Sequence, residues 1–351
     1  MNFQDICKNI FRFFKKNNHT EENPTKKQNN TNNIDTPSIS TDIISSNRKT
    51  SNDLTSSDID FNSYFKDLKK TLLGRDTIFL VNDTNNEIRQ HYDKSYVGHI
   101  DYNKFIKSQR QKKHYFNKQG MNYAFFAIPD KSILQKNRLP FKTNTPYRHV
   151  DKLGEVVYDL KDVVDETDCD ITDSHIKRTA GPKINAYILS KFHDKSYEYY
   201  LEKIYEKIKI YHVEKYKGDL MSQKNWSYGE GELKDKYYYV PTDAVNLVNE
   251  YETLIDEAPE EFKLYKKRPS LYFRNNQSIS NKKLLLLSDS YAERLFHSFI
   301  AYYREVFAYW DHWDFNEDVV KWYNPDDVVE LRGERFLDNP LYFSDMYHEE
   351  I

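Results

Sequence analysis

The chain has 351 residues, of which 38% are hydrophobic and 30% charged, enough apolar material for one large domain or two small ones. Its 52 lysines and arginines nearly balance 55 aspartates and glutamates, so the composition gives no sign of the clustered basic face that binds nucleic acids. The two cysteines, Cys7 and Cys169, are too far apart to indicate a disulfide framework or zinc-ligand spacing.

The first residues combine apolar side chains at helical spacing with several basic residues. Lys8, Arg12, Lys15 and Lys16 interrupt the apolar run that a secretory signal requires, and no stretch reaches the roughly 18 apolar residues of a transmembrane helix. We predict a basic amphipathic helix over residues 1–16 that lies on a membrane surface or docks on a partner. A cap on the folded domain, or a frayed end, is the alternative. The expected location is the cytosol or the inner face of the membrane.

The next segment, residues 17–58, is dominated by Asn, Thr, Ser, Asp and Lys and has almost no large apolar residues. Such a chain cannot bury enough surface to offset its ordering entropy, so we predict a disordered linker followed by one domain over residues 59–351. Within that domain we expect strands at residues 77–82, 123–128 and 156–160, and helices at 102–119 and 186–209. Residues 216–267 give no clear pattern.

The last quarter of the chain has the clearest pattern. Residues 284–287 are four consecutive leucines, which is typical of a strand buried on both faces. Helical spacing follows at 292–303 and 317–322, and strand-like runs at 306–310 and 328–331. This alternation predicts an α/β fold with a mostly parallel central sheet covered on both faces.

A serine follows the leucine strand directly, in Ser288-Asp289-Ser290. Ligands of open parallel sheets bind at the carboxyl ends of the strands, and helical spacing starts just after Ser290. We therefore expect an exposed hydroxyl at a strand-to-helix turn, with backbone N–H groups nearby that can stabilise an oxyanion. The alternative is that Ser288 or Asp289 only caps the helix.

A serine nucleophile needs a base and a group that orients the base. In Thr172-Asp173-Ser174-His175, His175 is the predicted base and Asp173 its orienting carboxylate. The alternative is that His175 is simply one of the chain's 11 histidines and lies on a surface loop without a catalytic role. A calcium loop is also conceivable, although the central glycine of the EF-hand pattern is absent. Its carboxylates would come from an acidic run, Asp165, Glu166, Asp168, Asp170 and Asp173. We expect no bound metal.

Two further groups are candidates for the substrate region. Asn275 and Asn276 lie shortly before the leucine strand and could donate to an oxyanion, or could form a plain turn. Trp310, Asp311 and His312 follow the next strand, so we expect them at the ligand edge of the sheet. The indole of Trp310 could stack on a sugar or could fill an aromatic core.

Taken in order, these motifs resemble the SGNH-hydrolase-like domain of the alginate O-acetyltransferase type, found in bacterial polysaccharide acetylation proteins. As in that family, the Asp-x-His pair precedes the serine. The resemblance covers residues 72–338 and implies a three-layer SGNH-like fold. Its blocks are Leu73-Gly74-Arg75-Asp76, Pro129-Asp130-Lys131, Val157-Tyr158-Asp159-Leu160, Thr172-Asp173-Ser174-His175, Gly218-Asp219-Leu220, Ser288-Asp289-Ser290 and Glu334-Arg335-Phe336-Leu337.

The chain departs from the family pattern in three places. Ser288 stands where the family usually has glycine, Ile176 where it has tryptophan, and Lys177-Arg178-Thr179 where it has an Asn- or Gly-rich segment. A further departure is the missing export signal, because family members that act on exported polysaccharide are usually periplasmic or membrane-linked.

The resemblance implies O-acyl transfer, with acetyl as the group, to or from a polysaccharide or other carbohydrate through an acyl-serine. It implies no cofactor beyond the acyl donor, which a membrane-bound acyltransferase partner could supply. Transferase and esterase activity remain open, because they differ only in the acceptor that the site admits. The competing hypothesis is an inactive SGNH-like module that binds carbohydrate or a partner.

Overall fold

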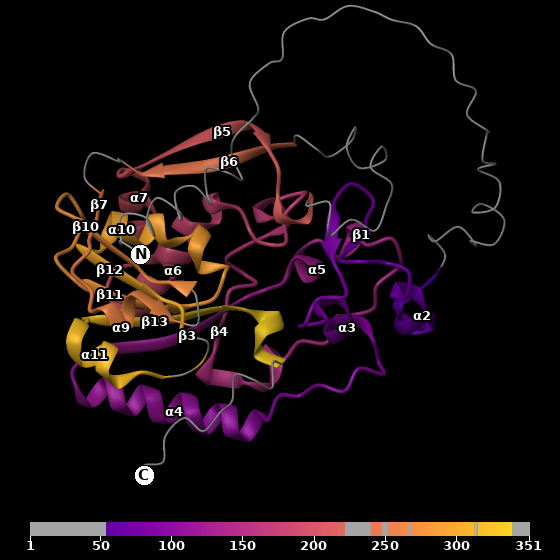
Figure 1. Cartoon of the computed structure of the whole chain (residues 1–351), viewed down its shortest axis with the longest axis horizontal. Coiled ribbons are helices and arrows are strands. Elements are labelled where there is room, and N and C mark those ends of the chain that lie inside the picture. Colours follow the sequence, from indigo (N-terminus) through magenta and orange to yellow (C-terminus); the bar gives the residue numbers. More distant parts are fainter. Residues whose placement is uncertain are drawn as a thin grey trace, which may run out of the picture.

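The computed structural model describes residues 54–221, 240–247, 252–265, 268–311, 313 and 315–338 (Figure 1). The predicted helix over 1–16 and most of the predicted linker lie outside these ranges. Within them, no helix combines the length and the apolar character that spanning a membrane requires.

The predicted end of the linker at residue 58 is wrong. The described chain begins at Leu54, and Ser56 is buried, with its N–H donating to Lys142 O at 2.7 Å. Its hydroxyl accepts a hydrogen bond from Asn144 N at 3.1 Å. This stretch has few apolar side chains, but its polar groups pair with residues 142–144, which the composition of the segment alone does not reveal.

Among the described residues, a seven-stranded sheet forms the centre of the molecule. Five neighbouring strands are parallel, and β10 runs antiparallel to both of its neighbours, which confirms the predicted α/β fold with a mostly parallel sheet. Across the sheet the order is β4 (Tyr158–Asp159), β3 (Asn122–Ile128), β13 (Asp327–Gly333), β11 (Lys283–Ser288), β12 (Glu305–Tyr309), β10 (Leu271–Asn275) and β7 (Glu252–Leu254).

The four leucines of β11 divide between two cores. Leu284 and Leu286 pack on one side of the sheet and Leu285 and Leu287 on the other, and all are 0–4% exposed. Burying a leucine side chain is worth about 1.5–3 kcal/mol, so this strand anchors the fold. Figure 1 shows the helices in two layers. On the first side lie α6 (Gly181–Phe192), α7 (Tyr197–Tyr205) and α10 (Phe296–Tyr302), and on the second α4 (Tyr102–Lys118) and α11 (Glu317–Tyr323).

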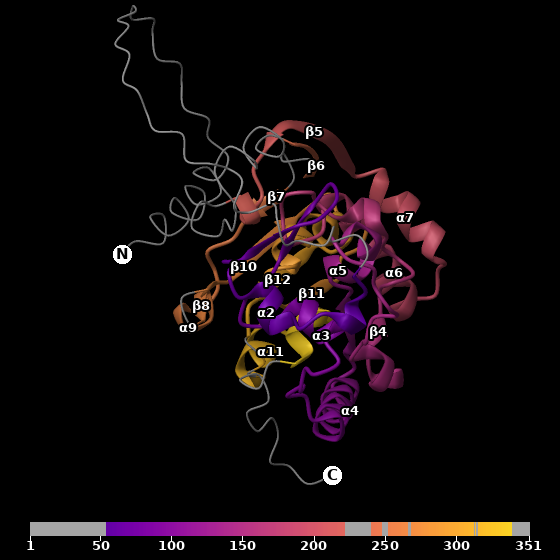
Figure 2. The same cartoon turned by 90° about the vertical axis from the view of Figure 1, so that its right-hand side faces the viewer.

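Smaller elements surround this three-layer body. The predicted strand at 77–82 exists, but it pairs antiparallel in a separate two-stranded sheet instead of joining the central one. The long hairpin of β5 and β6 lies on the side of the sheet opposite α4 in both views (Figures 1 and 2). The smaller elements outside the central sheet and its two helix layers are α2 (Phe61–Phe65), β1 (Thr71–Leu73), β2 (Ile78–Leu80), α3 (Glu87–Tyr92), α5 (Lys131–Leu134), β5 (Ile208–Tyr216), β6 (Val240–Leu247), α9 (Glu260–Lys263), β8 (Leu264–Tyr265) and β9 (Arg268–Pro269).

A buried ionic cluster ties β13 to α4. Lys112 Nζ lies 2.8 Å from Glu330 Oε2, which also accepts a hydrogen bond from Tyr123 OH at 2.6 Å. Arg332 contacts Glu330 at 3.1 Å, and all three charged side chains are 0–1% exposed. Burial alone would raise the pKa of Glu330, but Lys112 and Arg332 outweigh it and hold that pKa at about 2.

Removing the ammonium in Lys112→Met is expected to lower the free energy of unfolding at pH 7 by about 2–3 kcal/mol, because Arg332 then compensates the buried carboxylate alone. The ionised Glu330 favours the folded state above the ordinary glutamate pKa of 4.5, and this contribution is lost as the pH falls towards about 2. The variant's acid-unfolding midpoint should therefore move to higher pH, as measured by tryptophan fluorescence. An unchanged midpoint would contradict this.

Candidate active site

Ser290 lies at the carboxyl edge of the central sheet, directly after β11. The neighbouring strands end at the same edge, since Leu287 pairs with Tyr309 of β12 and Ser288 with Leu331 of β13. The predicted position of Ser290 is confirmed, but the helix expected immediately after it is not. A 3₁₀ turn over Ala292–Arg294 comes first, and α10 begins only at Phe296.

The buried carboxylate of Asp289 shapes the turn that presents Ser290. Its Oδ1 accepts a hydrogen bond from Tyr291 N at 2.8 Å and its Oδ2 one from Gly333 N at 2.9 Å. Together these bonds tie the turn to the end of β13. Within the described residues, the backbone N–H of Ser290 itself has no hydrogen-bond partner, so it can donate to an oxyanion.

The three residues predicted to act together do lie together. His175 Nε2 is 2.9 Å from Ser290 Oγ, and His175 Nδ1 is 2.8 Å from Asp173 Oδ1. When Nδ1–H donates to the carboxylate, the Nε2 lone pair faces the serine hydroxyl, which is the tautomer that a general base requires. The Asp173 side chain is fully buried, whereas that of His175 is 14% exposed, so substrate can approach the base and not the carboxylate.

Several donors converge on the carboxylate of Asp173. Oδ2 accepts from Tyr216 OH at 2.7 Å, from Asp219 N at 3.1 Å and from the guanidinium of Arg294. Burial alone would raise the pKa of Asp173, but Arg294 and the hydrogen bond from His175 outweigh it and hold the pKa well below its usual range. Asp173 is therefore ionised at neutral pH, as an orienting carboxylate must be.

Lys131 fixes the backbone of the loop that carries Asp173. Its buried ammonium donates to the carbonyl oxygens of Ile78 at 2.8 Å, Asp170 at 2.5 Å, Ile171 at 3.0 Å and Asp173 at 3.1 Å. A cation on four carbonyls holds the loop in one conformation, and this gives a physical role to the Pro-Asp-Lys block noted in the sequence.

The segment starting at Gly218 closes over the same loop. A Cβ on Gly218 would lie 2.1 Å from Thr172 O, so only glycine allows this approach. Thr172 O accepts from Leu220 N at 3.2 Å, and the Asp219 carboxylate accepts from both Ser174 N and Ser174 Oγ at 2.7 Å. The Gly-Asp-Leu block thus positions the loop that carries Asp173 and His175.

The acidic run does not form a calcium loop, because its carboxylates turn to different partners. Asp165 caps the turn at Thr167, Asp168 pairs with Lys183 at 2.8 Å, and Asp170 pairs with Arg294. In the described part of the chain, one group of three side chains could share a metal ion: Asp173, His175 and Asp219. Asp173 and His175 belong to the hydrogen-bonded series of Ser290, His175 and Asp173, which we call the serine relay. Arg294 already compensates the charge of Asp173.

Asn275, a candidate either for an oxyanion donor or for a plain turn, lies away from Ser290. Because β10 runs antiparallel to β12, Asn275 lies at the opposite edge of the sheet from Ser290, and Asn276 follows it in the same turn. The amide of Asn275 donates to Ile300 O at 2.9 Å and accepts from Gln277 N at 2.8 Å. These bonds support the alternative of a plain turn.

Trp310 and Asp311 follow β12 at the expected edge of the sheet, where each contacts an arginine outside the catalytic candidates. The Arg268 guanidinium lies 4.5 Å from the ring centre of Trp310. Asp311 is buried and forms an ion pair with Arg332, which belongs to the ionic cluster of β13. His312 lies outside the described residues.

Sequence reasoning did not identify Tyr216 and Arg294. Each has only a weak local signal, since Tyr216 comes two residues before Gly218 and Arg294 four residues after Ser290. Both contact the Asp173 carboxylate, and Arg294 also donates to the Tyr216 hydroxyl.

Replacing Tyr216 with phenylalanine is expected to lower kcat/KM for 4-nitrophenyl acetate by about 3–10-fold, because Asp173 loses one hydrogen bond to a charged group. The ring remains, so the melting temperature should change little. Tyr205→Phe is the matched control, because Tyr205 is 40% exposed at the end of α7. Equal rates in the two variants would show that the Tyr216 hydroxyl does not position Asp173.

No family model matches this chain, and no curated protein sequence matches it either. Among solved structures, Bacillus cereus PatB1 matches with a TM-score of 0.53 and 12% identity, over 78% of this chain and 99% of PatB1. This chain has the PatB1 fold. A structure of PatB1 with a sulfonyl adduct also matches, with a TM-score of 0.51 and 11% identity, over 78% of this chain and 98% of that one.

A further structural neighbour is the O-acetyltransferase domain of Pseudomonas putida AlgJ. It matches with a TM-score of 0.44 and 12% identity, over 77% of this chain and 92% of that domain. The match to PatB1 confirms the likeness predicted from the motifs at the level of the fold.

Proposed function

We propose that this protein transfers an acyl group, acetyl in the first instance, to or from a carbohydrate hydroxyl through an acyl-Ser290 intermediate. One observation carries the proposal: the hydrogen-bonded series from Ser290 Oγ through His175 to Asp173, at 2.9 and 2.8 Å. The acetyl group and the carbohydrate come from the motif resemblance to the alginate O-acetyltransferase type.

In the first half-reaction, Ser290 Oγ attacks the donor's acyl carbon while His175 Nε2 takes the hydroxyl proton. The carbonyl electron pair moves to oxygen, where the Ser290 N–H can stabilise it. The intermediate then collapses, the bond to the leaving group breaks, and His175 returns the proton to that group. Asp173, kept ionised by Arg294, stabilises the imidazolium throughout.

In the second half-reaction, the acceptor hydroxyl attacks acyl-Ser290 and gives its proton to His175. Ser290 Oγ then leaves and recovers that proton. A sugar hydroxyl as acceptor gives transfer, and water gives hydrolysis. The partners are therefore an acyl donor, which a membrane-bound acyltransferase could deliver, and a carbohydrate acceptor. The competing function is carbohydrate or partner binding without chemistry.

Labelling with phenylmethanesulfonyl fluoride tests whether Ser290 is an activated nucleophile, because a serine must be deprotonated by its base to displace fluoride. A sulfonyl adduct has been captured in PatB1. We expect a single adduct on the Ser290 peptide by mass spectrometry, and a labelling rate reduced by about 10²-fold or more in His175→Ala.

Ser288→Ala is the matched control, since Ser288 ends the same strand and should not affect labelling. Labelling that does not depend on His175, or no labelling at all, would overturn the acyl-transfer proposal and favour the binding function.

A further inference from the structure

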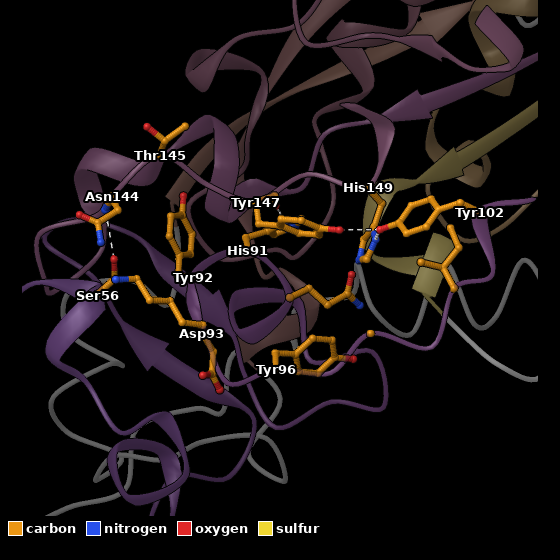
Figure 3. A pocket seen from close by; sticks show the side chains of 14 residues that line it. Ser56, His91, Tyr92, Asp93, Tyr96, Tyr102, Asn144, Thr145, Tyr147 and His149 are labelled. Carbon is orange, nitrogen blue, oxygen red and sulfur yellow. Dashed lines mark hydrogen bonds between the residues drawn. The ribbon is translucent and has the colours of Figure 1, made fainter. Parts of the chain in front are cut away.

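A cavity of about 440 Å³ lies beside α3, away from the candidate active site (Figure 3). Its walls come from residues between Ser56 and His149, and none of the serine-relay residues lines it. Cavities that bind small ligands typically measure about 300–1,000 Å³, so this one is large enough for a single ring with its substituents.

Tyrosine rings form one wall and the mouth of this cavity. Tyr102 OH lies 2.6 Å from Tyr147 OH and 2.8 Å from His149 Nδ1, and Figure 3 shows these three side chains in a row. Lys152 Nζ lies 5.2 and 4.9 Å from the ring centres of Tyr102 and Tyr147, and Tyr96 adds a third ring to the lining. These contacts fix the rings before any ligand arrives, which lowers the entropic cost of binding.

Two buried polar atoms of the lining have no hydrogen-bond partner in the described part of the chain: Gln90 Oε1 and His149 Nε2. Gln90 is 3% exposed and His149 2% exposed. The nearest carboxylate oxygen to His149 Nε2 belongs to Asp338, at 4.0 Å, which is beyond hydrogen-bond distance. Other buried side chains of the described chain also hold polar atoms without a partner, and these two belong to residues that line one cavity.

The charge of the lining favours a neutral ligand. Burial lowers the pKa of His149 to about 4, so its ring is uncharged at neutral pH. Asp93 is compensated by Arg89 at 2.9 Å, and the cations near the cavity are Lys94 in its lining and Lys152 against the rings of Tyr102 and Tyr147. Two separate lysines are a poor match for a phosphate, which favours clustered arginines and backbone N–H groups.

A pyranose has the two features that this lining requires. Its C–H face is apolar and flat enough to pack on a tyrosine ring, and its edge carries hydroxyls that donate and accept hydrogen bonds. A hydroxyl can donate to Gln90 Oε1, and another can pair with His149 Nε2. We propose that this cavity is a second binding site, which holds one uncharged sugar ring between the tyrosine wall and these two polar atoms.

The cavity is connected to the turn that carries Ser290. His91 lines the cavity, and its Nε2 lies 3.0 Å from Asp130 Oδ2. Asp130 Oδ1 in turn accepts a hydrogen bond from Tyr291 OH at 3.3 Å, and Tyr291 follows Ser290 in the chain. Two buried hydrogen bonds in series therefore link the lining of the sugar site to the residue after Ser290, although sugar binding does not depend on the acyl chemistry.

Saturation-transfer NMR on the full chain tests this site with two probes, methyl α-D-glucopyranoside and methyl 2-acetamido-2-deoxy-β-D-glucopyranoside. We expect at least one to receive saturation with a millimolar dissociation constant. Tyr147→Ala should weaken that binding by about 3–10-fold, because it removes a ring at the mouth. Gly98→Ala, which adds a methyl group at another residue of the lining, should also weaken it.

Tyr199→Ala on α7 is the matched control, because Tyr199 and Tyr147 are both 42% exposed, and it should bind as wild type does. Binding should also survive in Ser290→Ala, so failure of the sugar site is distinguishable from failure of the acyl-transfer proposal. No saturation of either probe, or equal binding by wild type and Tyr147→Ala, would overturn the proposal.

Discussion

Ser290→Ala is expected to lower kcat/KM for 4-nitrophenyl acetate by at least about 10³-fold, because the variant lacks the oxygen that forms the acyl-enzyme. The residual rate should resemble that of the solution reaction helped only by binding and by the oxyanion donor. The effect is measured as the rate of ester hydrolysis, followed by the absorbance of the nitrophenolate that is released.

The control for this substitution is Ser288→Ala, two residues away at the same strand end. Its side chain is buried and lies outside the serine relay, so the rate should stay within a few-fold of wild type. If Ser290→Ala hydrolyses the ester as fast as wild type does, Ser290 is not the nucleophile.

Asp173→Asn is expected to reduce both activity and stability. The rate should fall by about 10³–10⁴-fold, because an amide in place of the carboxylate cannot hold His175 in the required tautomer or stabilise its charged form. The free energy of unfolding should fall by about 3–5 kcal/mol, because Arg294 loses one of its two buried counterions. Ester hydrolysis and urea unfolding at pH 7 measure the two effects.

The pH dependence of stability gives the same substitution a second readout. The pKa of Asp173 is lower in the folded than in the unfolded protein, so its ionised form favours the folded state above the ordinary aspartate pKa of 3.8. That contribution is lost as the pH falls below this value, and Asp173→Asn should lack it. The wild-type and variant stabilities should therefore converge in acid.

Asp219→Asn is the matched control for Asp173→Asn. The Asp219 side chain is 43% exposed and accepts its hydrogen bonds from Ser174, so the change should cost less activity and less stability. Equal losses in the two variants would contradict the orienting role of Asp173.

The sequence predicted the centre of the fold well, because burial there depends on local pattern. Leu284 to Leu287 are apolar on both faces of the strand, and the structure divides them between two cores. The helix predicted at 102–119 and the strand predicted at 123–128 also form, although residues 102–119 carry only scattered apolar positions.

What the sequence left open concerns strand direction and sheet membership, which a local pattern does not encode. Asn275 lies close in sequence to the nucleophile strand, but β10 runs antiparallel and places it at the opposite edge. The strand at 77–82 pairs outside the central sheet, and Ser56 is ordered through bonds to residues 142–144. Each outcome depends on pairing between distant segments.

The candidate site shows the same division. Ser290, His175 and Asp173 were predicted because each belongs to a short motif with its own chemistry. Tyr216 and Arg294, which hold Asp173, come from segments 43 and 121 residues away in the chain and carry no motif of their own. Only the fold reveals that they converge on one carboxylate.

Mass spectrometry of the intact protein after brief exposure to 4-nitrophenyl acetate tests the central claim most directly. Wild type should gain the mass of one acetyl group on the peptide that contains Ser290, and Ser290→Ala and His175→Ala should gain none. Addition of a carbohydrate acceptor or water should then discharge the group. An acetyl group that appears equally in wild type and Ser290→Ala, or that maps to another peptide, would contradict the assignment of Ser290 as the acyl carrier.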